Sequence, residues 1–239
     1  MTRRRWIADE VSGDRAFLTG QNADHLVRVL RANVGQQFEI ATPDGVRLGE
    51  IVEIHPQRVV FSTTAISDQQ DGQHSSKVHL YLAIFKFDRF EWALEKCTEL
   101  GVSSIAPMIA SRTDAHLASA AAKRVERWRR LAHEAAQQSR RSDVPDIAVP
   151  EKLEKAVLAA RGQRIVLAEN EREQRFADVI EGSYELSLAV GPEGGWTESE
   201  LLLFRQNQWI AASLGQTILR AETAAMAALA VIQAQNRLR

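Results

Sequence analysis

The segment GPEGG, residues 191–195, combines three glycines with a proline and is the strongest local candidate for binding a ligand. It lies directly after the apolar run ELSLAV and directly before the helix-capping pattern Thr197-x-x-Glu200. Glycines let a backbone approach a ligand closely or adopt a positive φ. Pro192 stiffens the loop and removes one N–H donor, which suits holding a ligand more than wrapping a phosphate. Taken alone, the segment is equally consistent with a binding loop and with a tight turn that binds nothing.

Two further loops carry polar groups at the ends of expected strands. LGQTILRAET, residues 214–223, places Arg220 and Glu222 in otherwise apolar surroundings. A helix N-terminus would stabilise the Glu222 carboxylate, and Arg220 could simply pair with it. Glu169 and Asn170 leave the run RIVLAEN. Because ligands of open α/β sheets bind beyond the carboxyl ends of the strands, three such loops predict a pocket better than any one of them.

Several common catalytic chemistries lack their residue patterns in this chain. Neither GxGxxG nor GxxxxGK[ST] is present, so the two usual nucleotide fingerprints are missing. The six histidines show no HExxH or Cys/His spacing, so we expect no metal, and there is no GxSxG elbow. Cys97 is the only cysteine, and its place in an apolar helix stripe favours a core role over a nucleophilic one.

Alternating strands and helices are expected to position these loops. After a polar seam at residues 67–77, apolar runs alternate with helical patterns, which predicts a parallel sheet covered on both faces. We expect one helix to begin at Asp88 and end at Gly101, and a long helix to carry Leu117, Val125 and Trp128 on one face. The other expected elements are helices at 153–160 and 222–238, a helix capped by Thr197, and strands in KVHLYLAIFK, VSSIAPMIA, RIVLAE, ELSLAVG and WIAASLG.

The region before the seam has a mostly β pattern. QQFEIA and RLGEIVEI are short alternating runs joined by a turn containing Asp44-Gly45, which predicts a hairpin, and RVVFS supplies another strand. The exception is residues 22–31, where Asn22 can cap a helix with Leu26, Val29 and Leu30 at helical spacing. Several short strands and one helix in this length favour a small β-barrel.

Length and composition are those of a folded chain with one or two domains. The 239 residues are 45% hydrophobic and 26% charged. No apolar run is long enough to cross a membrane, and no apolar stretch follows the basic N-terminus as in a signal peptide. The single cysteine is typical of a reduced compartment, so we expect a cytoplasmic protein.

The near-neutral charge, 30 Lys+Arg against 31 Asp+Glu, argues against bulk electrostatic coating of nucleic acid. Two local basic clusters stand out: residues 123–141 carry seven Lys/Arg against two Glu, an excess of five, and Arg3, Arg4 and Arg5 are consecutive. For either cluster alone, a solvated face or a frayed terminus is the favoured explanation. Together, in a chain of almost zero net charge, they favour a patterned basic surface.

The order of these motifs resembles that of the bacterial 16S ribosomal RNA (uracil-N3) methyltransferases of the SPOUT superfamily. The segments that carry the resemblance span almost the whole chain: HLVRVLR, KFDRFEWALEKCTELGVSSIAPMIASR, RWRRLAHEAAQQSRR, GPEGGWTESE and LGQTILRAETA. The resemblance implies an α/β fold in which a knotted parallel-sheet SPOUT methyltransferase domain, residues 77–239, follows a small PUA-like β-barrel for RNA binding, residues 1–70. It also implies a deep trefoil knot, a homodimer, and a uridine of the decoding region of 16S rRNA, in the small subunit, as substrate.

The resemblance further implies S-adenosylmethionine as cofactor, with S-adenosylhomocysteine as product. The residues that it assigns to the cofactor are Leu167, Glu169, Asn170, Gly191, Pro192, Glu193, Gly194, Gly195, Leu214, Gly215, Ile218, Leu219 and Thr223. For N3 methylation we expect Arg220 to stabilise the uracil anion, and Glu222 or Glu193 either to accept the proton or to orient Arg220. The candidate RNA contacts are Arg3, Arg4, Arg5, Arg28, Arg31, Arg127, Arg130, Arg140 and Arg141.

Two other functions compete with this interpretation. An α/β enzyme with another nucleotide cofactor would need a phosphate fingerprint, which is missing. A non-catalytic RNA-binding module would not need two glycine loops at one sheet edge. The ligand that binds distinguishes these three functions. Binding of S-adenosylhomocysteine supports the transferase, and binding of NAD or ATP does not.

Overall fold

The chain divides into two compact units. The computed structural model describes residues 5–65, 77–181 and 185–236. Unit 1 comprises Met1–Gln73 and Ala136–Asp143, and unit 2 comprises His74–Ala135 and Val144–Arg239. Most of the expected seam at residues 67–77 lies outside the described residues. Residues 136–143 belong to the first unit, and the division expected from sequence contained no such return of the chain.

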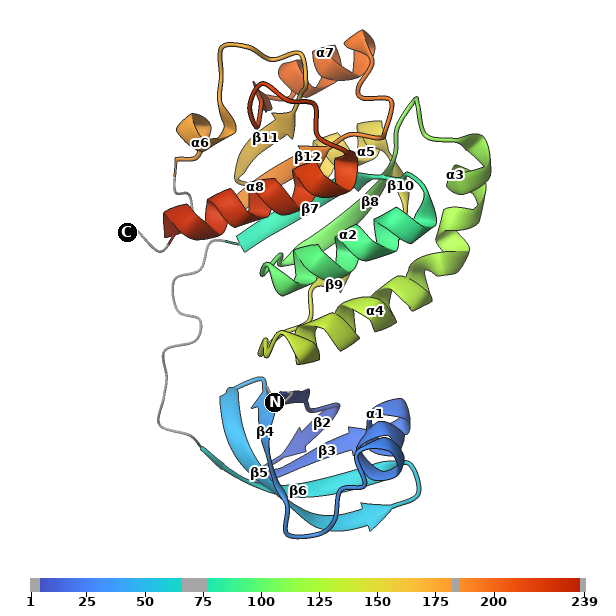
Figure 1. Ribbon diagram of the computed structural model, residues 1–239, viewed down its shortest axis with the longest axis vertical. Coiled ribbons are helices and arrows are strands. Elements are labelled where there is room, and N and C mark those ends of the chain that lie inside the picture. The colour runs from blue at the N-terminus through green and yellow to red at the C-terminus, as the bar shows by residue number, and fades with distance from the viewer. Residues whose placement is uncertain (1–4, 66–76, 182–184, 237–239) are drawn as a thin grey trace. The chain divides into compact units, whose positions relative to one another are not determined.

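Unit 1 is built on one curled sheet (Figure 1). The strand order is β1-β4-β5-β6-β3-β2, and all neighbours are antiparallel except β1 and β4. Since β1 and β2 lie at opposite ends of this order, the expected PUA-like barrel is an open half-barrel. The predicted hairpin is confirmed, because Thr42 pairs with Gly45 across the turn. The strands are β1 (Trp6–Ile7), β2 (Glu10–Ser12), β3 (Arg15–Thr19), β4 (Gln37–Thr42), β5 (Gly45–His55) and β6 (Arg58–Ala65).

The helix expected at residues 22–31 takes a different form. Helix α1 spans Gly20–Asp24, with Thr19 rather than Asn22 at its N-cap, and a π turn follows at His25–Val29. A π turn holds more residues than an α turn, so side chains at α-helical spacing rotate off the buried face. Leu26 is accordingly buried, whereas Val29 and Leu30, which were expected to face the core, are exposed.

Unit 2 contains a parallel sheet, as predicted. Its order is β10-β8-β7-β12-β11-β13, and β9 pairs with β8. Leu80, Ile165 and Leu188 lie in neighbouring strands and are fully buried, in agreement with the near-continuous apolar runs. The strands are β7 (Lys77–Ala83), β8 (Ser104–Ile109), β9 (Asp146–Ile147), β10 (Glu151–Lys152), β11 (Gln163–Leu167), β12 (Glu185–Val190) and β13 (Ile210–Ala212).

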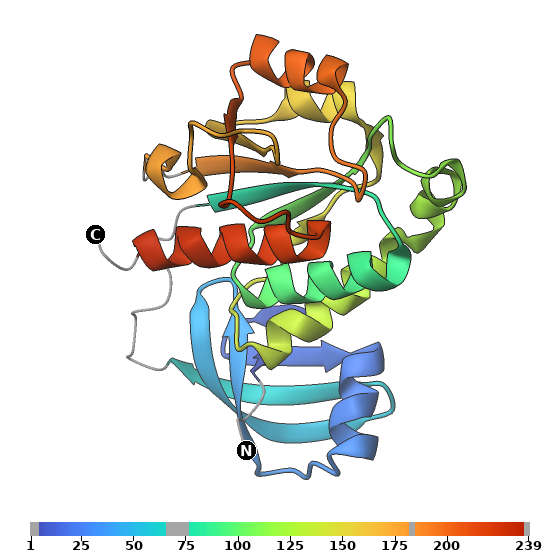
Figure 2. The same ribbon diagram turned by 45° about the horizontal axis from the view of Figure 1, so that its top comes forward.

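Helices cover both faces of this sheet (Figure 2). Phe90 of α2 and Leu229 of α8 belong to the apolar core on one face, and Leu153 of α5 and Phe204 of α7 to the core on the other. This arrangement and the curled sheet of unit 1 confirm the expected fold class. The helices are α2 (Phe87–Glu99), α3 (Ala115–Ala121), α4 (Val125–Gln138), α5 (Leu153–Ala159), α6 (Phe176–Val179), α7 (Glu198–Gln206) and α8 (Ala221–Asn236).

Helix ends were predicted with mixed success. The Thr197–Glu200 capping box of α7 is confirmed. Helix α2 begins earlier than expected, because Lys86 is its N-cap and Asp88 lies in its first turn. The single long helix expected around Val125 is wrong, since a 3-10 turn at Ala122–Arg124 separates α3 from α4. Each half retains its apolar face, which explains why the periodicity looked continuous.

Candidate active site

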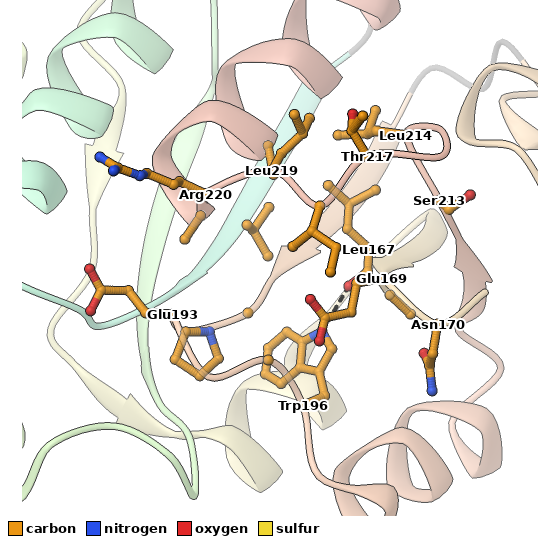
Figure 3. A pocket seen from close by; sticks show the side chains of 18 of the residues that line it. Leu167, Glu169, Asn170, Glu193, Trp196, Ser213, Leu214, Thr217, Leu219 and Arg220 are labelled. Carbon is orange, nitrogen blue, oxygen red and sulfur yellow. Dashed lines mark hydrogen bonds between the residues drawn. The ribbon is translucent and has the colours of Figure 1, made fainter. Parts of the chain in front are cut away.

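A cavity of about 460 Å³ opens at the carboxyl edge of the unit 2 sheet (Figure 3). The loops after β11, β12 and β13 line it together with the start of α2. Leu167 of β11 pairs with Ala212 of β13, and Val190 of β12 pairs with Leu82 of β7, so the strands end at one edge. Small-molecule sites are typically about 300–1,000 Å³. The cavity therefore has the size and the position of a ligand site.

Most of the predicted cofactor residues meet in this cavity. Gly194 and Thr223 do not line it, and Glu222 lies outside its wall. The sequence did not single out Lys86, Arg89, Trp196 and Ser213, which also line it, as do Gln216 and Thr217 of the expected loop at 214–223. The predicted residues in the wall are Leu167, Glu169, Asn170, Gly191, Pro192, Glu193, Gly195, Leu214, Gly215, Ile218, Leu219 and Arg220.

The GPEGG segment folds as a tight turn that also lines the cavity. The Gly195 amide donates to the Pro192 carbonyl over 2.9 Å, and Gly195 has a φ of 69° in the left-handed region. A Cβ atom on Gly195 would lie 3.0 Å from Oε1 of Glu169. Gly194 faces elsewhere, because Arg112 donates to its carbonyl and a Cβ there would meet the Arg112 side chain. The segment is therefore a tight turn, and Gly195 is the glycine of its final pair that lines the cavity.

Trp196 joins two of the loops. Its Nε1 donates to the Leu167 carbonyl at the end of β11 over 2.9 Å, and its ring packs against Phe204 at 4.9 Å. Gly191 passes close to the indole, where a Cβ would lie 3.1 Å from a ring carbon. A tryptophan directly after a glycine pair was the available signal, but its partner was not visible in the sequence.

The loop at residues 214–219 offers backbone groups to a ligand. Within the described part of the chain, no backbone–backbone hydrogen bond engages the amides of residues 214–219. Ile218 and Leu219 are exposed in this loop. Buried amides are almost always paired, so accessible unpaired amides at a cavity wall are donors that a ligand can use.

One end of the cavity is charged. Arg89 of α2 pairs with Glu193 over 2.8 Å and lies 4.0 Å from Glu222. Glu222 is buried in the first turn of α8, and its Oε2 has no partner. Among the ion pairs of the described residues, none joins Arg220 to Glu222, so the expected pair between them is replaced by Arg89. Figure 3 shows Arg220 and Glu193 on one side of the cavity and Asn170 on the other, with the Glu169 side chain between them.

The predicted RNA-binding arginines differ in their environment. Arg3 and Arg4 lie outside the described residues. Arg5 is buried and pairs with Glu39 over 3.1 Å, and Arg140 pairs with the same carboxylate. Burial would raise the pKa of Glu39, but hydrogen bonds from Arg140 and Arg5 lower it below its ordinary value.

The remaining arginines are more exposed, with one exception. Arg127 pairs with Glu91 over 2.9 Å, and Arg130 lies 4.0 Å from Glu134. Arg141 is mostly buried and pairs with Asp143 over 2.7 Å. Arg28 and Arg31 lie on the surface of unit 1.

The described residues offer neither an accessible thiol nor a metal-binding cluster. Burial raises the pKa of the Cys97 thiol to about 12, so this cysteine is a core residue, as predicted. No group of three His, Cys, Asp or Glu within the described residues is placed to hold a metal ion. None of the helices in this part of the chain is long and apolar enough to span a membrane.

Replacing Gly195 with valine should weaken ligand binding at this cavity by at least 100-fold. The branched side chain would occupy the space beside Glu169 and would force a β-branched residue into the left-handed region. Calorimetric titration of S-adenosylhomocysteine measures the effect. Gly194→Val is the matched control, and it should retain far more affinity because Gly194 does not line the cavity. Unchanged affinity in Gly195→Val would show that the ligand binds elsewhere.

Comparison with known proteins finds a matching family for each unit. The family described as an RNA methyltransferase domain matches residues 72–233, and the family described as an RNA methyltransferase PUA domain matches residues 18–63. Ribosomal RNA small subunit methyltransferase E of Bacillus subtilis is 31% identical, over 92% of this chain and 90% of its own length. The enzyme of the same name from Synechocystis sp. is 32% identical, over 91% of this chain and 72% of its own length.

A solved structure shares the whole architecture. The crystal structure of ribosomal RNA small subunit methyltransferase E from Neisseria gonorrhoeae, bound to S-adenosyl methionine, superposes with a TM-score of 0.86 at 28% identity. The match covers 98% of each chain. Together with the two matched families, these similarities confirm the resemblance that the motifs indicated. The chain belongs to the ribosomal RNA small subunit methyltransferase E family.

Proposed function

We propose that this protein transfers a methyl group from S-adenosylmethionine to N3 of a specific uridine in the decoding region of 16S rRNA, within the assembled small ribosomal subunit of the cytoplasm. The observation that carries the proposal is the cavity at the carboxyl edge of the sheet, with free backbone donors at one wall and arginines at one end. Family membership supports the reaction class, and the charged end of the cavity supports an anionic acceptor.

The residues of the cavity fit S-adenosylmethionine. Leu167, Leu214 and Leu219 supply apolar surface for an adenine ring, and residues 214–219 supply unpaired amides for its edge. Glu169 is exposed beside Gly195, where its carboxylate can accept hydrogen bonds from ribose hydroxyls. The bound cofactor supplies a methyl group on a cationic sulfur. The protein's task is to hold the acceptor in line with that group.

The acceptor nitrogen sets the second task. N3 of uridine is a poor nucleophile while it carries its proton. Loss of this proton spreads negative charge from N3 onto the two carbonyl oxygens. Arg220 lines the cavity and is not paired with Glu222, so its guanidinium is available to stabilise a developing oxyanion. Glu193 is exposed at the same end but is held by Arg89, which suits a carboxylate that orients neighbouring groups or accepts the proton.

Glu222 has a different role from the one first considered. Its side chain is buried outside the cavity wall, with Arg89 at 4.0 Å. A group in this position acts on the site through Arg89 and not by touching the uracil. We therefore propose Arg220 as the catalytic residue and Glu222 as a positioning residue.

RNA contacts are proposed for the exposed arginines Arg28, Arg31, Arg127 and Arg130. Removing one phosphate contact should lower the slope of log RNA affinity against log salt concentration by roughly 0.7 to 0.9. Arg5 and Arg140 share the carboxylate of Glu39, so their loss should instead reduce the stability of unit 1.

A homodimer is the proposed assembly, and α8 carries the surface that supports it. Thr223, Ala227, Ala230 and Ala234 follow a helical repeat along its outward side, and none of them is buried. A solvent-facing helix normally presents charged residues on this side. Since α8 begins at the cavity, a partner chain covering this face would lie close to the ligand.

Replacing Ala230 with arginine should convert the protein to a monomer. A charged side chain in an apolar interface is costly to desolvate, so light scattering should report 26.7 kDa in place of twice that mass. Ala159→Arg, at an exposed alanine of α5, is the matched control and should leave the mass unchanged. A dimer that survives Ala230→Arg with undiminished stability would place the interface elsewhere.

The proposed function is tested by ligand and by substrate. S-adenosylhomocysteine should bind, while NAD and ATP should not. Labelled methyl groups should pass to small subunits prepared from cells that lack the protein, and not to large subunits. Transfer to large subunits, or preferential binding of NAD or ATP, would contradict the proposal.

A further inference from the structure

Unit 1 exposes a cluster of aliphatic side chains directly after its helix. Val29, Leu30 and Val34 are 64%, 50% and 60% exposed, whereas Leu26 and Ala32 in the same segment are buried in the core. We call the three exposed side chains the apolar knuckle. Isolated apolar residues are common on surfaces, but three exposed ones within six residues of one segment call for an explanation.

The backbone holds this knuckle outward. The Leu30 amide donates to the His25 carbonyl over 3.1 Å, which closes the π turn, and the Ala32 amide donates to the Leu26 carbonyl over 3.1 Å. Arg31 between them has a φ of 53°, a left-handed conformation that residues other than glycine rarely adopt. Short π segments and such backbone outliers are frequent at functional sites.

The base of the knuckle is rigid. Leu26 and Ala32 pack in the same core cluster as Trp6. The His25 ring lies against the indole of Trp6, with centroids 5.9 Å apart. These contacts anchor the segment in the core on both sides of Val29 and Leu30.

Positive charge flanks the apolar atoms. The Arg28 side chain is 79% exposed, with its guanidinium 3.5 Å from Asp24, and Arg31, which follows Leu30 in the chain, is also exposed. Asp24 therefore offsets Arg28, whereas none of the ion pairs among the described residues involves Arg31. Aliphatic side chains between cations match a strand of RNA, in which flat apolar bases alternate with phosphates.

We propose that the apolar knuckle packs against the face of an unstacked RNA base, while Arg28 and Arg31 hold the flanking phosphates. This inference rests on the proposed rRNA substrate and assigns a recognition element to unit 1. Proteins that separate stacked bases insert Leu, Ile, Met or similar wedges between them. Three short side chains cover far less area than a stable protein–protein interface requires, which favours a base over a protein partner.

The test compares two RNA duplexes of equal length, one perfect and one with a single unpaired uridine. At low ionic strength both are bound through phosphates, so both affinities are measurable by fluorescence anisotropy. The wild-type chain should prefer the bulged duplex. Val29→Ala/Leu30→Ala should lose about 5- to 100-fold in affinity for it, the range typical for removing the contact to one base, and should bind both duplexes alike.

Matched variants distinguish the effect of the apolar knuckle from the effect of charge and from the loss of apolar surface at any other position. Val149→Ala/Leu158→Ala removes the same groups from exposed positions in unit 2, at 56% and 69% exposure, and should bind like wild type. Arg28→Ala should reduce the salt slope by about one contact and retain the preference for the bulge. The knuckle variant should shift affinity equally at every salt concentration, because it removes no charge.

Three outcomes would overturn the inference. These are an unchanged preference for the bulge in Val29→Ala/Leu30→Ala, an equal loss in the Val149→Ala/Leu158→Ala control, and a loss seen only with assembled subunits. The last would show that the knuckle contacts a feature of the assembled particle and not a single unpaired base. Titration of S-adenosylhomocysteine and methyl transfer by the wild-type chain test the proposed function separately, so either proposal can fail while the other stands.

Discussion

Replacing Arg220 with alanine should slow methyl transfer about 100-fold in a single turnover and leave the affinity for S-adenosylmethionine nearly unchanged. The sulfur of the cofactor is already cationic, so a guanidinium gains nothing by binding it. The useful partner of Arg220 is the uracil oxygen that becomes negative as N3 loses its proton, and this interaction acts mainly in the transition state. Rapid-quench assays and calorimetry on the same preparation measure the two quantities.

Two further observations make this prediction specific. Raising the pH should partly restore the Arg220→Ala rate, because hydroxide then helps to ionise N3. Arg205→Ala, at an exposed arginine near the end of α7, is the control and should retain the wild-type rate. If Arg220 only braced the start of α8, Glu222→Ala would cause parallel damage, but Glu222 faces Arg89. A stable Arg220→Ala protein with normal turnover would remove this residue from the mechanism.

Replacing Gly162 with alanine should destabilise unit 2 by more than about 4 kcal/mol, an unusually large effect for one methyl group. Gly162 has a φ of 65°, and a Cβ there would lie 2.1 Å from the backbone oxygen of Glu185. That oxygen belongs to β12 and is held by the sheet, so it cannot move aside. Denaturant unfolding measures the loss.

Gly101 provides the comparison for that variant. It also has a positive φ, 85°, but its Cβ would meet the Nε2 atom of Gln233, the end of a flexible side chain. Gly101→Ala should therefore cost only the left-handed backbone penalty of about 1–2 kcal/mol. Equal losses in the two variants would show that backbone conformation, and not the collision with β12, controls Gly162.

Much of the fold follows from hydrophobic periodicity. The buried strands β7, β11 and β12 and the capping box of Thr197 were predictable because each rests on a local pattern. Strands β1, β2 and β3 were not identified. Strands β1 and β2 have three residues or fewer, and β1 and β3 pair with β4 and β6, which lie far along the chain. Periodicity also cannot show how a chain threads, so a knotted path follows from resemblance alone.

The site was predictable to the extent that it lies on loops after parallel strands. Residues 191–195 and 214–220 follow β12 and β13, and the order of a parallel sheet brings such loops to one edge. Arg89 and Lys86 were missed because they come from the start of α2, about a hundred residues earlier in the chain. The pairing of Glu222 with Arg89 is likewise a tertiary contact that no local spacing encodes.

The position of the transferred methyl group tests the central claim most directly. Small subunits from cells lacking this protein should be incubated with the pure chain and S-adenosylmethionine, and their 16S rRNA digested to nucleosides for mass spectrometry against synthetic standards. The account predicts a single new nucleoside, 3-methyluridine, from the decoding region. A new methyl group on carbon 5 of the base, on a ribose oxygen, or on any base other than uracil would contradict it.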